Sequence, residues 1–304
     1  MKLLQKIVLG ILLFLFVTAL TLFGSILFDG ITGKDRLNSL VNTVIPGRNG
    51  GPDVLAYVAK PKGEGPYPVV VMIHEFYGLN ESVVGRSDGL AKEGYVVIAP
   101  DTFRGSTTAF IPRAIYQVIS TKPENVDQDL DTVYSWIKAD EKLSKQPIAI
   151  LGFCYGGRTS LNYSLHNPNL DATVVFYGSP VTDAAILQAL PGPILGIFGG
   201  SDNSIAIEDV KAFETALNTA KIPNEISIYD GQPHAFVSDM ETIEAGGAAG
   251  QAWQQMLRFL EINLSKEGTT TFSPMVSDYR SFFDWKYYAL LAYEHSIGTA
   301  SHVH

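Results

Sequence analysis

The sequence predicts an α/β fold with a mostly parallel sheet covered by helices on both faces, preceded by an N-terminal transmembrane helix. Between residues 54 and 264, short runs of β-branched and apolar residues alternate with helical stretches. Runs that are apolar at consecutive positions are typical of strands buried on both faces, and their alternation with helices favours a parallel sheet. Ahead of them, residues 7–28 form one uncharged apolar run, about as long as a helix that crosses a bilayer.

The expected elements follow one another without an internal repeat or a low-complexity tract. We expect strands at residues 54–59, 68–73, 95–101, 147–152, 172–178, 193–199 and 224–229, and helices at residues 82–93, 126–138, 156–166, 208–220 and 250–262. This pattern makes residues 53–265 a single α/β domain. Residues 1–30 are then a membrane anchor, residues 31–52 a polar linker, and residues 266–304 a C-terminal extension.

The composition excludes several classes of protein. The 304 residues include 22 Lys and Arg against 31 Asp and Glu, which gives a net charge of −9. Because phosphate binding needs clustered Lys and Arg, this balance argues against a nucleic-acid partner. With 46% hydrophobic and 17% charged residues, the chain has ample apolar material for a core and is not a disordered protein. A single cysteine excludes an internal disulfide.

The N-terminal apolar run has two interpretations, an uncleaved anchor or a cleaved signal peptide. Signal peptides have apolar regions of only ~7–15 residues and end in small residues at a cleavage site. The run here is longer and ends in Phe-Gly-Ser-Ile-Leu-Phe without a clear site of that kind, which favours the anchor. Lys2 and Lys6 precede it, so we expect a single-pass chain with a cytoplasmic N-terminus and its domain on the non-cytoplasmic side. If the segment is cleaved, we expect a secreted domain.

The C-terminal extension is rich in aromatic residues. They are Phe272, Tyr279, Phe282, Phe283, Trp285, Tyr287, Tyr288 and Tyr293. Such a segment can lie at a membrane interface, cover a functional site, or pack on the domain. The sequence leaves these three alternatives open.

The sharpest local signal is residues 152–157, Gly-Phe-Cys-Tyr-Gly-Gly, which follow an expected strand and open an expected helix. The pattern G-x-C-x-G is that of the nucleophile elbow of α/β-hydrolases, with cysteine in place of serine. The elbow is a strained turn whose neighbouring positions must lack side chains, and the helix N-terminus behind it stabilises a thiolate. We therefore predict that Cys154 is a nucleophile rather than a small buried hydrophobic residue.

A cysteine nucleophile needs a base, and the base needs an acid that orients it. In α/β-hydrolases the acid and then the histidine follow the nucleophile, on loops after later strands. Asp202 follows the strand expected at residues 193–199, and His234 follows the strand expected at residues 224–229. We therefore predict a Cys154–His234–Asp202 triad.

The other sequence signals do not indicate a metal centre. His166 ends an expected helix and is interpreted as a solvated cap. His74 ends an expected strand and is interpreted as a residue that supports the site. The run His74-Glu75-Phe76-Tyr77-Gly78 lacks the second histidine of the H-E-x-x-H zinc motif, and we expect no metal and no organic cofactor.

Cys154, Asp202 and His234, together with the run that begins at His74-Glu75, resemble the dienelactone hydrolase family over about residues 54–264. The resemblance implies that the triad cleaves lactones and esters through an acyl-enzyme, and that Glu75 contacts the cysteine and takes part in its activation.

The same resemblance implies an oxyanion hole made by the backbone N–H groups of Phe76 and Tyr155. It also implies arginines that hold a substrate carboxylate. Arg104 is a candidate for one of them, whereas the position of the other, four residues after the triad histidine, is occupied by Ser238. The departure at Ser238 weakens the case for a dienelactone substrate and for any movement of Glu75 that depends on that arginine.

The leading hypothesis is a membrane-anchored hydrolase of small esters or lactones. One alternative is a thioesterase or peptidase type of acyl hydrolase on the same fold, because a fold does not fix the substrate. Another is a membrane-tethered binding module without catalysis, although a binding role does not require all three triad residues.

Overall fold

The computed structural model describes residues 2–48, 50–265, 287, 289–291 and 293. In these residues a sheet of eight strands has the order β1-β2-β4-β3-β5-β6-β7-β8, in which the β1–β2 and β2–β4 pairs are antiparallel and the others parallel. The strands are β1 (Thr43–Ile45), β2 (Val54–Ala59), β3 (Val69–Ile73), β4 (Val96–Pro100), β5 (Ile148–Phe153), β6 (Ala172–Phe176), β7 (Ile194–Gly199) and β8 (Asn224–Tyr229). The expected mostly parallel sheet is therefore confirmed.

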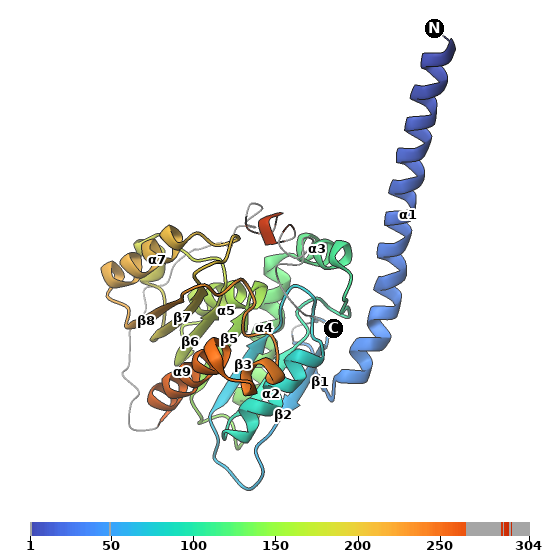
Figure 1. Cartoon of the computed structure of the whole chain (residues 1–304). Helices are drawn as coiled ribbons and strands as arrows, with labels where there is room; N and C mark the ends of the chain where they lie inside the picture. Colours follow the sequence, from blue (N-terminus) through green and yellow to red (C-terminus); the bar gives the residue numbers. More distant parts are fainter. Residues whose placement is uncertain (1, 49, 266–286, 288, 292, 294–304) are drawn as a thin grey trace.

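Helices cover both faces of the sheet, with α2 and α9 over one face and α4 and α5 over the other (Figure 1). The helices are α1 (Lys2–Leu40), α2 (Glu81–Lys92), α3 (Ile111–Ser120), α4 (Pro123–Ala139), α5 (Tyr155–His166), α6 (Ala184–Leu187), α7 (Ile207–Ala220), α8 (Met240–Glu244) and α9 (Gly247–Leu264). Every residue of the consecutive parallel strands β3, β5, β6 and β7 is buried, as their unbroken apolar runs predict.

The expected linker at residues 31–52 is wrong. Helix α1 continues without a break to Leu40, and β1 then joins the edge of the sheet beside β2. Leu37 is fully buried in the domain core. The charged residues of the turn before it account for the polar composition from which a linker was predicted. The chain therefore passes from the apolar run into the domain through a packed helix rather than through a flexible segment.

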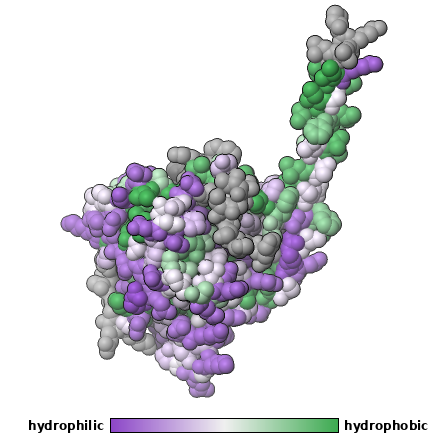
Figure 2. Space-filling model, viewed as in Figure 1, coloured by the Kyte–Doolittle hydropathy of each residue, from purple (hydrophilic) through white to green (hydrophobic). Residues whose placement is uncertain are grey.

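The first part of α1 projects away from the domain (Figure 1). Its side chains from Ile7 to Phe28 are largely exposed and apolar, as the surface in Figure 2 shows. The helix is long and apolar enough to cross a membrane, a property that a signal sequence shares.

Three helices were not expected from the sequence, namely α3, α6 and α8. Two of them, α6 and α8, span only one turn, for which the apolar periodicity of a sequence gives little signal. Most of the aromatic extension lies outside the described residues. Within it, Tyr287 and Leu291 are helical and buried.

A close approach of backbones joins α5 to the end of β3. A Cβ atom on Gly156, in the first turn of α5, would lie under 3.0 Å from the carbonyl oxygens of Ile73 and His74. Only glycine therefore lets the helix sit this close to the central strand, and this contact fixes the start of α5 against the loop after β3.

We predict that Gly156→Ala destabilises the full-length protein, because backbone atoms surround the added methyl group and cannot give way as a flexible side chain can. The expected cost is about 1–3 kcal/mol or more, seen as a lower midpoint in thermal unfolding in detergent. The matched control is Gly85→Ala in α2, where the nearest atom to an added Cβ is 3.7 Å away. Alanine there should be neutral or slightly stabilising, and equal effects of the two substitutions would contradict this account.

Candidate active site

Cys154 lies at the turn between β5 and α5, as predicted. Its φ of +57° and ψ of −116° are unusual for a residue with a side chain, and its N–H donates to the carbonyl of Phe176 on β6 at 2.9 Å. Gly152 contributes to the turn because a Cβ there would lie under 3.0 Å from the carbonyl of Gly156. The strand-to-helix turn thus has the strained geometry of a nucleophile elbow, with the side chain of Cys154 2% exposed.

The structure brings Asp202 and His234 together beside Cys154. His234 Nδ1 and Asp202 Oδ2 are 2.7 Å apart, and both residues are buried. Burial alone lowers the pKa of His234, but the charges of Asp202 and Cys154 and hydrogen bonds with both outweigh it and raise that pKa well above 6.5. The arrangement therefore favours a protonated imidazole between the carboxylate of Asp202 and the side chain of Cys154.

Ser204 is a neighbour of this pair that sequence reasoning missed. Its hydroxyl donates to Asp202 Oδ1 at 2.6 Å and lies 3.2 Å from His234 Nδ1, and its N–H also donates to Asp202 Oδ1. Burial raises the pKa of Asp202, but the His234 charge and the hydrogen bonds from His234 and Ser204 more than offset this and lower it below 3.8. Asp202 is therefore held as a carboxylate that orients the imidazole.

Glu75, on the loop after β3, is paired with a buried arginine that the sequence did not reveal. Arg86 on α2 is 0% exposed, and its guanidinium donates to Glu75 Oε2 at 3.1 Å and to the carbonyl of Val237 at 3.0 Å. The same guanidinium lies 3.9 Å from the ring centre of Phe153, the residue before Cys154. A lone arginine in a mostly polar helix carries no sequence signal for this role.

His74 stabilises the loop after β3 through hydrogen bonds of its ring. Burial lowers its pKa to about 4, so the ring is neutral at pH 7. Its Nε2 accepts the N–H of Thr102 at 3.1 Å, which leaves Nδ1 to donate to the carbonyl of Glu75 at 2.7 Å. His74 thus ties the loop after β3 to the end of β4, in line with the supporting position expected for it.

Phe76 and Tyr155 occupy neighbouring segments of the same site. Phe76 follows Glu75, and Tyr155 is the first residue of α5, which Gly156 holds against the end of β3. The ring of Tyr155 stacks near that of His74, with centroids 5.9 Å apart. Their backbone N–H groups therefore remain our prediction for the oxyanion hole.

Arg104 does not have the free guanidinium that a substrate anchor needs. Its Nε and one terminal nitrogen each donate to a carboxylate oxygen of Asp129 at 2.9 Å, and further bonds reach Gln128 and the carbonyl of Asn125. All these partners lie on α4. The expectation that Arg104 binds substrate is therefore not supported, because its charge is already neutralised by Asp129.

The C-terminal extension reaches the site through Tyr287. Its hydroxyl lies 3.7 Å from Cys154 Sγ and donates to the carbonyl of Tyr177 at 3.2 Å, and the residue is only 3% exposed. Of the three alternatives for the extension, packing on the domain and covering the candidate site both describe this residue. Tyr287 was one of eight aromatic residues in the segment, and nothing in the sequence distinguished it from the others.

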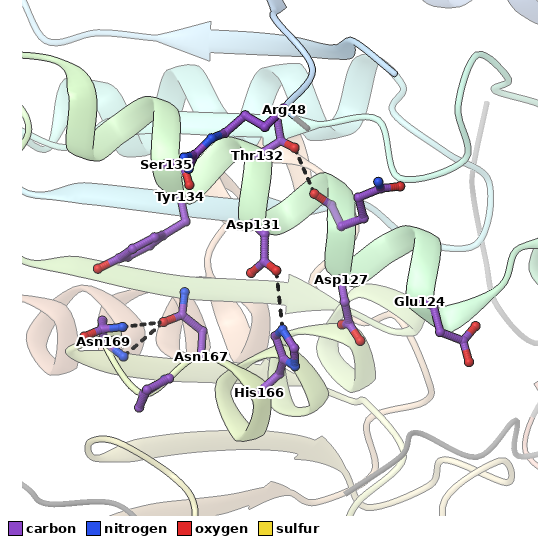
Figure 3. A pocket seen from close by; sticks show the side chains of 12 residues that line it. Arg48, Glu124, Asp127, Asp131, Thr132, Tyr134, Ser135, His166, Asn167 and Asn169 are labelled. Atoms are coloured by element: carbon purple, nitrogen blue, oxygen red, sulfur yellow. Dashed lines mark hydrogen bonds and ion pairs between the residues drawn. The ribbon is translucent and has the colours of Figure 1, made fainter. Parts of the chain in front are cut away.

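A separate pocket of about 640 Å³ lies at the opposite end of α5 (Figure 3). Asp131 and His166 form an ion pair across it at 3.4 Å, and burial raises the pKa of nearby Asp127 to about 6. Because α5 runs from Tyr155 to His166, its length of about 18 Å separates this pocket from Cys154. Within the described part of the chain, no group of three or more His, Cys, Asp or Glu side chains could hold a metal ion.

Comparisons with known proteins identify the family of this chain and agree with its fold. The sequence model of the Dienelactone hydrolase family matches residues 54–264. A proposed carboxymethylenebutenolidase of Escherichia coli (strain K12) is 36% identical over 234 residues, covering 72% of this chain and 85% of that protein.

Solved structures show the same likeness. The crystal structure of a proposed dienelactone hydrolase from Klebsiella pneumoniae is 34% identical, covers 71% of this chain and 95% of that one, and has a TM-score of 0.63. A dienelactone hydrolase-like promiscuous phosphotriesterase from metagenomic libraries, at 20% identity and a TM-score of 0.62, shows the same fold over 73% of this chain and 98% of that one. The α/β-hydrolase fold is therefore confirmed, and the chain belongs to the dienelactone hydrolase family.

Proposed function

We propose that this protein is a membrane-anchored hydrolase of small esters or lactones that works through a Cys154–His234–Asp202 triad. The observation that carries the proposal is the buried pair of His234 and Asp202, which interacts with the side chain of Cys154 at a strained elbow. Membership of the dienelactone hydrolase family and the likeness to carboxymethylenebutenolidases support ester or lactone hydrolysis.

In the first half of the reaction the thiolate of Cys154 attacks the carbonyl carbon and forms a C–S bond. The carbonyl electron pair moves to oxygen, and the N–H groups of Phe76 and Tyr155 would donate hydrogen bonds to the resulting oxyanion. Each such donor lowers the barrier by roughly 3–4 kcal/mol in such sites. When the C–O bond breaks, the imidazolium of His234 gives its proton to the leaving alkoxide. The products of this half are an alcohol and a thioester on Cys154.

In the second half, neutral His234 accepts a proton from water, and the resulting hydroxide attacks the thioester. Breaking the C–S bond releases the carboxylic acid and restores the thiolate beside the imidazolium. Throughout, Asp202 keeps its charge and its 2.7 Å contact with Nδ1, which holds Nε2 on the side of Cys154.

The substrate class follows from the described arginines near the site, none of which is positioned to bind a substrate carboxylate. The family's second arginine position is Ser238, and Arg104 is neutralised by Asp129. Arg86 is likewise paired with Glu75 and is fully buried. With its nearby arginines engaged, the site is better suited to neutral esters and lactones than to the carboxylate of a dienelactone.

The membrane anchor is part of the proposal. An uncleaved α1 is favoured because its last turns are packed into the domain, where Leu37 is fully buried. Lys2 and Lys6 precede the apolar run, so the N-terminus is cytoplasmic and the domain lies on the opposite side.

We predict that Cys154→Ala lowers the turnover of p-nitrophenyl acetate by the full-length protein at least about 10³-fold, because no other group forms the thioester. The measurement is p-nitrophenolate release, with mass spectrometry of the quenched wild type to detect one acetyl group on Cys154. An unchanged unfolding midpoint shows that the variant is folded. If the folded variant and the wild type turn over equally, the mechanism is wrong.

We predict that Asp202→Asn destabilises the protein by roughly 1–3 kcal/mol in a pH-dependent way. The raised pKa of His234 gives stability that is complete below 6.5 and is lost as the pH rises through the folded-state value. The lowered pKa of Asp202 gives stability that is present above 3.8 and is lost as the pH falls through its folded-state value. The difference between wild type and variant should therefore be largest between 3.8 and 6.5.

Thermal unfolding across this pH range provides the measurement for Asp202→Asn. The matched control is Asp230→Asn, which changes an exposed aspartate shortly before His234 in the same loop. A pH-independent difference, or an equal effect of the control, would show that the pair does not have the charges assigned to it.

We predict that Tyr287→Ala raises the rate at which iodoacetamide alkylates Cys154 by about tenfold or more, because the thiol loses its cover. Tyr287→Phe keeps the ring and should leave the rate near that of the wild type. Tyr293→Ala is the control, since Tyr293 is 62% exposed in the same segment. Equal rates for Tyr287→Ala and Tyr293→Ala would show that Tyr287 does not limit access.

A further inference from the structure

The last turns of α1 are bonded to the loop that precedes α3. Asp29 accepts a hydrogen bond from the hydroxyl of Thr108 at 2.5 Å and pairs with Arg36 at 2.8 Å. Arg36 also donates to the carbonyl of Thr107 at 3.0 Å, and a Cβ on Gly33 would lie under 3.0 Å from the same carbonyl. The helix that leaves the apolar run is therefore fixed to this loop in position and direction.

Asp29 also marks where the apolar run ends. Residues 7–28 carry no charge, and Asp29 is the first charged residue after them. In a spanning helix the edge of the hydrocarbon layer therefore lies within about one turn of Asp29. Because Thr108 is bonded to Asp29, the loop at residues 106–108 lies at the same level.

The same loop holds the backbone of the candidate oxyanion segment. Thr108 N–H donates to the carbonyl of Tyr77 at 2.9 Å, and the Thr107 hydroxyl donates to that carbonyl at 3.2 Å. On the next helix, Gln117 donates to the carbonyl of Phe76 at 3.5 Å. Two successive hydrogen bonds of Thr108 thus connect the residue at the end of the apolar run to the loop that carries Glu75 and Phe76.

Helix α3 lies against α1 at the end of the domain toward which α1 projects (Figure 1). It buries Ala114, Gln117 and Val118 but leaves Tyr116 48% and Ile119 54% exposed. An apolar face with a tyrosine on a helix beside a membrane span is typical of helices that lie in the bilayer interface.

We propose that α3 lies in the membrane interface with Tyr116 and Ile119 toward the lipid, so that the active site opens beside the bilayer. The substrates are then amphiphilic esters or lactones that partition into the membrane and enter from it. The occupant of the exposed face is the lipid bilayer, because α1 places this face at the membrane surface. The substrate class rests on the hydrolase activity proposed above, whereas the position of α3 rests only on the membrane anchor proposed there.

The position of α3 is measured with the full-length protein in phosphatidylcholine–phosphatidylglycerol vesicles. Cys154 is the only cysteine, so Cys154→Ser gives a background in which Ile119→Cys or Tyr116→Cys carries a single nitroxide label. We expect oxygen to relax these labels more than a water-soluble nickel complex does. The control is Ile262→Cys on α9, which is 67% exposed and should show the reverse.

A label at residue 119 as accessible to the nickel complex as one at residue 262 would overturn the proposal. Burial of residue 119 from both reagents, with spin–spin broadening between labels, would also overturn it, since a second copy of the chain would then cover the face. Normal circular dichroism of each labelled variant shows that the fold is retained.

The substrate class is measured by the ratio of turnover of vesicle-borne p-nitrophenyl laurate to that of soluble p-nitrophenyl acetate. Ile119→Glu should lower this ratio about tenfold, the effect of removing one isoleucine side chain from an apolar environment. Ile262→Glu should leave the ratio unchanged. An unchanged ratio in Ile119→Glu would overturn the membrane route even if α3 contacts lipid.

The two proposals fail in different ways. If the wild type hydrolyses neither ester, the proposed function is wrong and the substrate class falls with it, while the labels still report where α3 lies. If the wild type hydrolyses acetate and the label at residue 119 is in water, the hydrolase proposal stands and the membrane-facing site is wrong.

Discussion

The strained turn at Cys154 is the constraint on which the rest of the site depends. A positive φ on a residue with a side chain costs of order 1–3 kcal/mol and persists only where the surroundings enforce it. Here β5 is hydrogen-bonded between β3 and β6, the N–H of Cys154 bonds to β6, and Gly156 lets α5 press against the end of β3. The direction of the sulfur is thus set by three strands and a helix rather than by the loop itself.

Two buried ion pairs are arranged around that sulfur. One is Asp202–His234, which we propose as the proton relay, and the other is Glu75–Arg86. Val237, three residues after His234, links the two pairs. Its carbonyl accepts hydrogen bonds from Arg86 and from the hydroxyl of Tyr177. Since removing one partner leaves an uncompensated buried charge, each pair depends on both of its members. The pairs therefore fix geometry more than they add stability.

Much of the fold, and the places of the three proposed triad residues in it, could be predicted because each signal is local. Buried strands are apolar at nearly every position, the elbow is six consecutive residues, and Asp202 and His234 lie on the loops that follow two strands. Arg86 could not be predicted, since it meets Glu75 and Val237 only after α2 packs on the sheet. The linker prediction failed for a related reason: polar composition at residues 31–40 reflects one face of α1, while Leu37 on the other face is buried.

Two segments outside the region that matches the family, α1 and the segment of Tyr287, contact the candidate site or a loop beside it. The triad, Glu75 and Arg86 fall within residues 54–264, which the family model covers. The contacts that bear on access come from elsewhere: α1 bonds to the loop at residues 106–108, and Tyr287 lies on the thiol. The proposed chemistry therefore lies within the family domain, and the segments that we expect to affect access lie on either side of it. The thiolate–imidazolium pair of the proposed mechanism would gain from burial, because charges interact more strongly when water is excluded. The contact of Tyr287 with Cys154, which we expect to limit access, would then also strengthen the interactions on which the proposed nucleophile depends.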